Sequence, residues 1–175
     1  MTRTMLLAAA GSCLLLVATG AANAADVTAE ELMQRLEGVA PPAVLENSTL
    51  MHITEGGEMQ TVREGTNQWT CMYPGTDPMC VDEAGLGWVQ AYATQGEPPE
   101  VPGFAYMLLG DEGASNIDPY AEGPTEDNEW VQTGPHVMIF GAPEMFASYP
   151  VEPDPSVPYV MWRDTPYAHL MIPTE

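Results

Sequence analysis

The spacing of apolar residues divides the chain into short segments that follow either a helical or a strand periodicity. Apolar residues recur at helical spacing over residues 28–39, where Thr28 can cap the helix and Glu31 completes a capping box. The same spacing predicts a second helix over residues 82–94, with Asp82 as its N-cap. Segments rich in glycine and proline follow both stretches, which indicates that both helices end there.

The other periodic segments alternate every two residues or form short apolar runs, as half-buried and buried β-strands do. Glycine-rich turns separate the first three of them, so their order along the chain predicts an antiparallel meander. Four more strands are predicted after the second helix, and the last two of these should form a hairpin. The predicted strands are 49–54, 58–64, 68–72, 104–109, 136–139, 159–162 and 167–172.

Helices that flank many short strands, without regular alternation of strand and helix, indicate an α+β fold. We therefore expect one globular domain over residues 25–175, with an antiparallel sheet of six or seven strands and two flanking helices. A long polar segment, residues 110–128, shows no periodicity. Loops of this length are uncommon in compact domains and are often functional, so this segment is a candidate lid over a binding site.

The first residues follow the pattern of a secretory signal peptide. Arg3 precedes an apolar run over residues 5–17, and small residues at 22–24 form a cleavage site. The run is shorter than the roughly 20 apolar residues that a membrane-spanning helix needs. We therefore expect residues 1–24 to be removed and the rest of the chain to be exported, to the periplasm or out of the cell, without membrane insertion.

The chain is strongly acidic, with 25 acidic residues against four basic ones and a formal net charge of −21. Such a surface repels nucleic acid and anionic membranes, so neither is an expected partner. The charge suits recruitment of a cation or a basic partner, or simply a solvated surface that resists aggregation. The acidic residues are spread along the chain rather than gathered in one tail, which favours the second interpretation.

Three cysteines are present, and Cys13 lies inside the apolar run of the signal peptide. In an exported chain, the remaining close pair, Cys71 and Cys80, predicts a disulfide. The alternative is a pair of thiolate ligands for a metal. A gap of eight residues is not a familiar zinc spacing, which argues against that alternative.

Several short sequence motifs together resemble those of a family of exported bacterial proteins. They are GTNQWTCM (65–72), DPMC (77–80), GPHVMI (134–139), PYVMW (158–162) and TPYAHLMIP (165–173). The resemblance covers most of the chain after the signal peptide. It implies export and a single domain. No activity, cofactor or catalytic residue is assigned to that family, so the resemblance implies nothing about mechanism.

Two of the three histidines lie in near-identical sequence motifs, HVMI (136–139) and HLMI (169–172). Side chains two apart on a strand share a face, so each strand would present a histidine together with a methionine. Imidazole and thioether groups suit copper, which makes His136, Met138, His169 and Met171 candidate metal ligands. The alternative is that both methionines fill gaps in an ordinary core.

A non-catalytic pocket is the interpretation that the sequence favours, with a small ligand or metal ion bound near His136 and His169. Aromatic residues from several predicted strands would line it together with the two histidines. The candidate lining residues are His136, His169, Tyr106, Trp130, Trp162 and Tyr167. In the alternative interpretation, these residues form a plain aromatic core whose histidines hydrogen-bond to the backbone.

A hydrolase is the main alternative function. Ser115 lies in the long polar segment and would be the nucleophile, with His136 or His169 as the base and Asp118 or Asp111 orienting the ring. The segment lacks the strand–turn–helix context of a nucleophile elbow, and serine in such loops commonly forms turns. A third possibility is an envelope structural or interaction protein that binds no small ligand.

Overall fold

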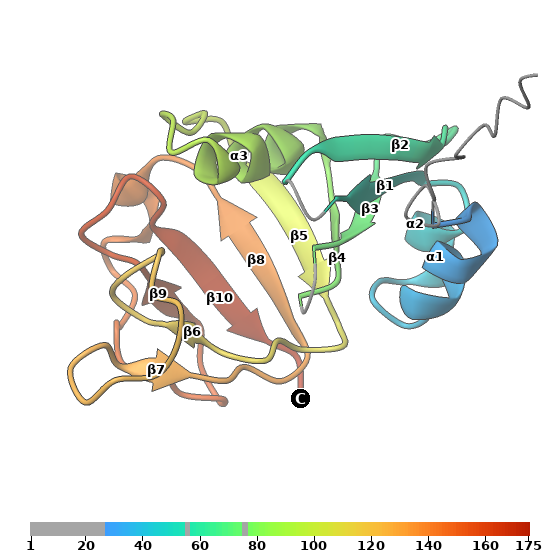
Figure 1. Ribbon diagram of the computed structural model, residues 1–175. Helices are drawn as coiled ribbons and strands as arrows, with labels where there is room; N and C mark the ends of the chain where they lie inside the picture. The colour runs from blue at the N-terminus through green and yellow to red at the C-terminus, as the bar shows by residue number, and fades with distance from the viewer. Residues whose placement is uncertain (1–26, 55–56, 75–76) are drawn as a thin grey trace, which may run out of the picture.

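The computed structural model describes residues 27–54, 57–74 and 77–175, and its main feature is one large twisted sheet (Figure 1). Eight strands form this sheet in the order β2-β1-β3-β4-β5-β8-β10-β9, and β6 and β7 form a separate pair. The strands are β1 (Thr49–Ile53), β2 (Met59–Arg63), β3 (Thr70–Tyr73), β4 (Met79–Val81), β5 (Gly103–Met107), β6 (Ala114–Ser115), β7 (Trp130–Val131), β8 (His136–Phe140), β9 (Tyr159–Met161) and β10 (His169–Pro173). Among the described strands, every neighbouring pair is antiparallel except β1 and β3, which run parallel.

Four short helices accompany the sheet in the described part of the chain. They are α1 (Ala29–Arg35), α2 (Pro42–Leu45), α3 (Glu83–Ala93) and the 3-10 helix η1 (Pro143–Phe146). Within the described ranges, no helix is long and apolar enough to cross a membrane. The predicted signal peptide, residues 1–24, lies outside the described residues.

A large sheet with few helices agrees with the predicted α+β class, but the sheet is larger than the six or seven strands expected. All seven predicted strands are present in it. The eighth is β4, whose three residues are too short to show a periodic pattern. The hairpin of the last two predicted strands is confirmed, because β9 and β10 pair antiparallel.

The predicted meander of the first three strands is wrong. β2 pairs with one side of β1, and β3 returns to pair with the other side. The connection between β2 and β3 passes over the start of β1, where the Gly65 N–H donates to the Thr49 hydroxyl. A Cβ atom on Gly65 would lie only 2.2 Å from the Thr49 backbone nitrogen, so this crossing requires glycine.

Both predicted helices are confirmed, with the caps that the sequence indicated. The Thr28 hydroxyl accepts from the Glu31 N–H at 3.2 Å, and the Glu31 carboxylate accepts from the Thr28 N–H at 2.9 Å. α1 ends before residue 39, because the chain turns at Gly38 with φ of +88°. The Asp82 carboxylate caps α3 and also accepts from the Phe104 N–H at 3.1 Å, which ties this helix to β5.

The two faces of the sheet are covered by different parts of the chain (Figure 1). On one face, α3 packs against β4 and β5, and the segment that contains β6 and β7 lies over the strands near the C-terminus. On the other face, α1 packs against β1 and β3, and η1 packs against β10. Side chains alternate between the faces along each strand, so β8 buries His136, Met138 and Phe140 towards α3.

The predicted disulfide is confirmed between Cys71 and Cys80. These residues lie directly opposite each other on β3 and β4, and both are fully buried. They face α1, in a cluster with Leu32 and Leu36, on the side of the sheet away from α3. Closing so short a loop stabilises the fold by about 2.5–3 kcal/mol in the chain-entropy account.

Candidate functional site

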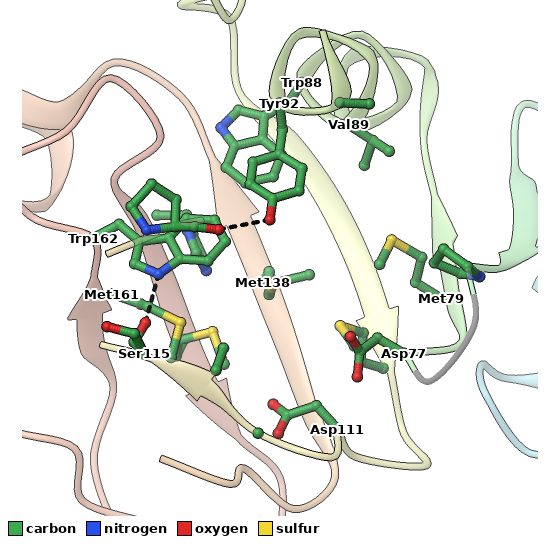
Figure 2. A pocket seen from close by; sticks show the side chains of 18 of the residues that line it. Asp77, Met79, Trp88, Val89, Tyr92, Asp111, Ser115, Met138, Met161 and Trp162 are labelled. Carbon is green, nitrogen blue, oxygen red and sulfur yellow. Dashed lines mark hydrogen bonds between the residues drawn. The ribbon is translucent and has the colours of Figure 1, made fainter. Parts of the chain in front are cut away.

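A cavity of about 460 Å³ lies on the face of the sheet that α3 covers (Figure 2). Its volume is within the range of small-molecule sites, about 300–1,000 Å³. The lining residues come from strands along the whole sheet, from Ile53 on β1 to Met171 on β10, and from α3 and residues 111–121. The predicted lid, residues 110–128, therefore does contribute to one side of this cavity.

Methionine dominates the apolar part of the lining. The register places Met138 directly opposite Met171 on neighbouring strands, so their side chains share the α3 face. Six methionines from six strands line the cavity: Met59, Met79, Met107, Met138, Met161 and Met171. Unbranched thioether side chains adapt to the shape of what they contact, and they attract aromatic rings. The lining is thus a deformable apolar surface.

His136 and His169 both line the cavity, from the neighbouring strands β8 and β10. They lie at opposite ends of the strand pair, because His136 is opposite Pro173. Four residue positions separate them, about 13 Å along the strands. A single ion has ligand bonds near 2 Å, whereas the backbone positions of the two histidines are this far apart, so a copper site shared by all four ligands stays a prediction. Among the described residues, no group of three or more His, Cys, Asp or Glu is placed to hold a metal.

Each histidine instead has its own pair of methionines. His136 lies directly opposite Met107, and its strand neighbour on the same face is Met138. His169 lies directly opposite Met161, and its corresponding neighbour is Met171. The twin sequence motifs therefore give each histidine two methionine neighbours, and the two groups meet in the middle of the β8–β10 pair, where Met138 lies opposite Met171.

In their neutral form, both imidazoles have a tautomer that a backbone carbonyl fixes. Nδ1 of His136 is 2.7 Å from the Gly134 carbonyl oxygen, and Nδ1 of His169 is 2.9 Å from the Tyr167 carbonyl oxygen. A carbonyl only accepts, so Nδ1 carries the proton and Nε2 is an acceptor. Burial lowers the pKa of both rings, that of His169 to about 4. Nε2 of His136 is buried and has no hydrogen-bond partner among the described residues.

Two carboxylates lie at the His136 end of the cavity (Figure 2). The Asp111 carboxylate accepts from the Thr133 N–H at 3.0 Å, and the Asp77 carboxylate accepts from the Glu112 N–H at 3.3 Å. Burial raises the pKa of Asp111, and the nearby negative charge of Asp77 raises it further, against the opposing effect of the Thr133 hydrogen bond. This end of the cavity is therefore acidic and rich in acceptors.

Three aromatic rings form the opposite wall of the cavity (Figure 2). Trp162 stacks on Tyr92 with ring centroids 5.4 Å apart and on Trp88 at 6.0 Å. Trp162 has φ of +58°, a conformation that is uncommon for a bulky residue. It is held there because its backbone N–H donates to the Asn116 carbonyl at 2.8 Å and its indole N–H donates to the Ser115 carbonyl at 2.7 Å.

The structure gives Ser115 a role in a turn. Its hydroxyl donates to the Asn128 carbonyl and accepts from the backbone N–H groups of Ile117 and Asp118. Among the described residues, no hydrogen bond joins Ser115 to a histidine. Asp118 lines the cavity but is exposed, and its carboxylate accepts from the Tyr120 N–H at 2.9 Å. The predicted nucleophile, base and acid are therefore not linked as a triad.

Three of the six predicted lining residues, His136, His169 and Trp162, do line the cavity. Tyr106 lies on the other face of the sheet, 5.3 Å from Trp69 between ring centroids. Tyr167 is buried behind the aromatic wall, where its hydroxyl donates to the Gly96 carbonyl at 2.7 Å. Trp130, on β7, packs beside Gly113 rather than in the cavity.

Trp88, Asp77 and four of the methionines in the lining were not predicted. Trp88 lies on the buried side of a correctly predicted helix, so its periodicity could have indicated it. Asp77 precedes β4, a strand too short for its periodicity to be seen. Comparison with protein-family models, with curated proteins and with solved structures finds no match to this chain.

Proposed function

We propose that the protein binds a small, largely apolar molecule in the cavity between α3 and the sheet. The observation that carries this proposal is the lining itself: about 460 Å³ bounded by six methionines and three stacked aromatic rings. An apolar surface that faces an open volume gains free energy when an apolar molecule replaces water there, about 25 cal/mol for each Å² removed from water. Adaptable thioethers suit a ligand of variable shape.

Binding accounts for the polar groups of the site better than catalysis does. The Ser115 hydroxyl is engaged on all sides by backbone groups, so it is not positioned as a nucleophile. His169 has a pKa of about 4, because it is buried, and such a ring is a poor general base at neutral pH. A few hydrogen-bonding groups in an otherwise apolar cavity are typical of sites that orient a ligand.

A neutral fluorescent probe tests the proposal. We expect N-phenyl-1-naphthylamine to bind saturably, with an increase in its fluorescence. Met59→Gln with Met79→Gln places two amides in the apolar lining. This change should weaken binding at least about tenfold, because an apolar probe would have to displace the water that hydrates the amides without replacing its hydrogen bonds. Both methionines are only half-buried, so the fold should tolerate the change.

Met33→Gln is the matched control, because Met33 is a half-buried methionine that packs on the other face of the sheet. It should leave probe binding unchanged. Absence of saturable binding to the wild-type protein, or equal weakening by the control substitution, would contradict the proposal.

A second candidate ligand is a copper(I) ion, favoured by the placement of Met161 and Met171 around His169. The Nε2 atom of His169, whose Nδ1 is bound to the Tyr167 carbonyl, forms with two thioethers a soft ligand set of the kind that copper(I) prefers. Anaerobic titration with copper(I) against a chromogenic chelator should then show one bound ion, and Met161→Leu with Met171→Leu should remove it. Leucine keeps the core apolar. Equal copper(I) affinity in the wild type and this variant would exclude the candidate.

A further inference from the structure

We propose that the occupant of the cavity is an organic cation, with an apolar or aromatic body and a protonated amine. This inference rests on the proposed function and names the chemical class of its ligand. It follows from the groups that the cavity offers at its polar end, from the walls that surround the apolar part, and from the charge of the whole chain.

The polar end offers negative charge and hydrogen-bond acceptors. Two carboxylates, of Asp77 and Asp111, lie there, with Asp118 at the exposed edge, and no lysine or arginine is found among the described residues of the lining. Arg63 and Arg163 donate to backbone carbonyls elsewhere in the molecule. His136 is the basic side chain near Asp111, and it is a single imidazole beside two acids. A ligand cation would supply the permanent positive charge that these described lining residues lack.

His136 gives an independent indication that a donor is missing. Its ring is fully buried, and Nδ1 is committed to the Gly134 carbonyl. Nε2 is left as a buried acceptor with no hydrogen-bond partner among the described residues, within the lining of the cavity. Buried polar atoms are almost always satisfied, so such an acceptor points to a donor from outside the chain. An ammonium group has three donors and can serve the two carboxylates and this nitrogen together.

The remaining walls suit a cation with an apolar body. The rings of Trp88, Tyr92 and Trp162 and the thioethers offer apolar surface that fits the alkyl or aryl body of the ligand, away from its charged group. The net charge of −21 raises the concentration of cations at the surface and speeds their association. A fatty acid has an equally apolar body, but its carboxylate would meet Asp77 and Asp111 as a like charge. Among ligands with the same apolar body, the negative charge of the site therefore favours an amine over a carboxylate.

Three probes of one shape test the inference: 4-phenylbutylamine, 4-phenylbutanol and 4-phenylbutyrate. Each competes with bound N-phenyl-1-naphthylamine, and the concentration for half displacement is measured. We expect the amine to displace the probe at a concentration at least about tenfold lower than the alcohol, and the carboxylate to be the weakest of the three. Equal displacement by the amine and the alcohol would overturn the inference.

Substitution of the two acids identifies the source of the preference. Asp77→Asn and Asp111→Asn keep the side-chain shape and the accepting oxygen but remove the charge. Each should reduce the advantage of the amine over the alcohol several-fold, measured as the ratio of their half-displacement concentrations. Asp164→Asn, on the exposed turn between β9 and β10, makes the same change in net charge and should have no effect.

The outcomes separate the two proposals. If the neutral probe does not bind at all, the proposed function itself fails. If the probe binds but the amine has no advantage, only the cation inference fails. An equal loss of amine preference in Asp164→Asn and Asp111→Asn would also overturn the inference, because general attraction to an acidic surface would then explain the preference.

Discussion

Replacement of Trp88 by alanine is expected to lower the free energy of unfolding by about 3–5 kcal/mol, as truncation of a large buried aromatic residue does. Trp88 is 4% exposed and lies where α3 meets the sheet. Its ring stacks on Phe140 with centroids 4.4 Å apart and meets His169 edge-on at 5.3 Å. Truncation would leave a void between these rings and would also remove one wall of the cavity. Urea denaturation, followed by far-ultraviolet circular dichroism, measures the change.

Trp88→Phe is the matched variant, because the indole N–H of Trp88 is buried and has no hydrogen-bond partner in the part of the chain that the structure describes. A buried donor without a partner costs about 1–3 kcal/mol, and phenylalanine removes that cost while keeping a stacked ring. We therefore expect Trp88→Phe to lose less than half of what Trp88→Ala loses. A Trp88→Ala protein within about 1 kcal/mol of the wild type would contradict the packing described for α3.

Acidification from pH 6.5 to pH 4 is expected to cost about 3 kcal/mol of folding free energy through His169 alone. Burial holds the pKa of this ring at about 4 in the folded protein, against 6.5 for an ordinary histidine. The unfolded chain therefore binds more protons in this interval, and stability falls as the pH falls. The lowered pKa of His136 acts in the same direction, whereas the raised pKa of Asp111 acts in the opposite direction.

Two measurements check this expectation. Nuclear magnetic resonance titration of the histidine ring protons should show the His169 ring neutral at pH 5, with its resonance assigned by its loss in His169→Gln. The unfolding free energy of that variant should vary less steeply between pH 6.5 and pH 4 than that of the wild type. Protonation of the native His169 ring near pH 6.5 would refute the assigned burial.

Local patterns in the sequence were sufficient for both longer helices and seven strands, and insufficient for the topology. The capping box at Thr28 and the cap at Asp82 depend on contacts within a few residues, and both are present. The parallel pairing of β1 with β3 depends on a chain crossing at Gly65, and turn residues alone do not show on which side a strand returns. β4 has only three residues and is stabilised by partners on both sides, so its own sequence carries little signal.

The site was predictable to the extent that it follows strand alternation. The words around His136 and His169 indicated two histidines and two methionines on one face, and β8 and β10 are indeed neighbours. The antiparallel register of β8 and β10, which separates the two rings, could not be read from these short motifs. Tyr106 was misplaced because its neighbours on the strand, not Tyr106 itself, face α3.

The methionine lining has a chemical consequence. A thioether sulfur takes up one oxygen atom from peroxide and becomes a sulfoxide, which is polar, chiral and no longer suited to an apolar surface. Six such sulfurs surround a single cavity, so oxidants would alter the interior that a ligand occupies. A bound ligand would shield these sulfurs. Where oxidants are present, the methionines of the ligand-free protein would therefore be oxidised faster than those of the ligand-bound protein.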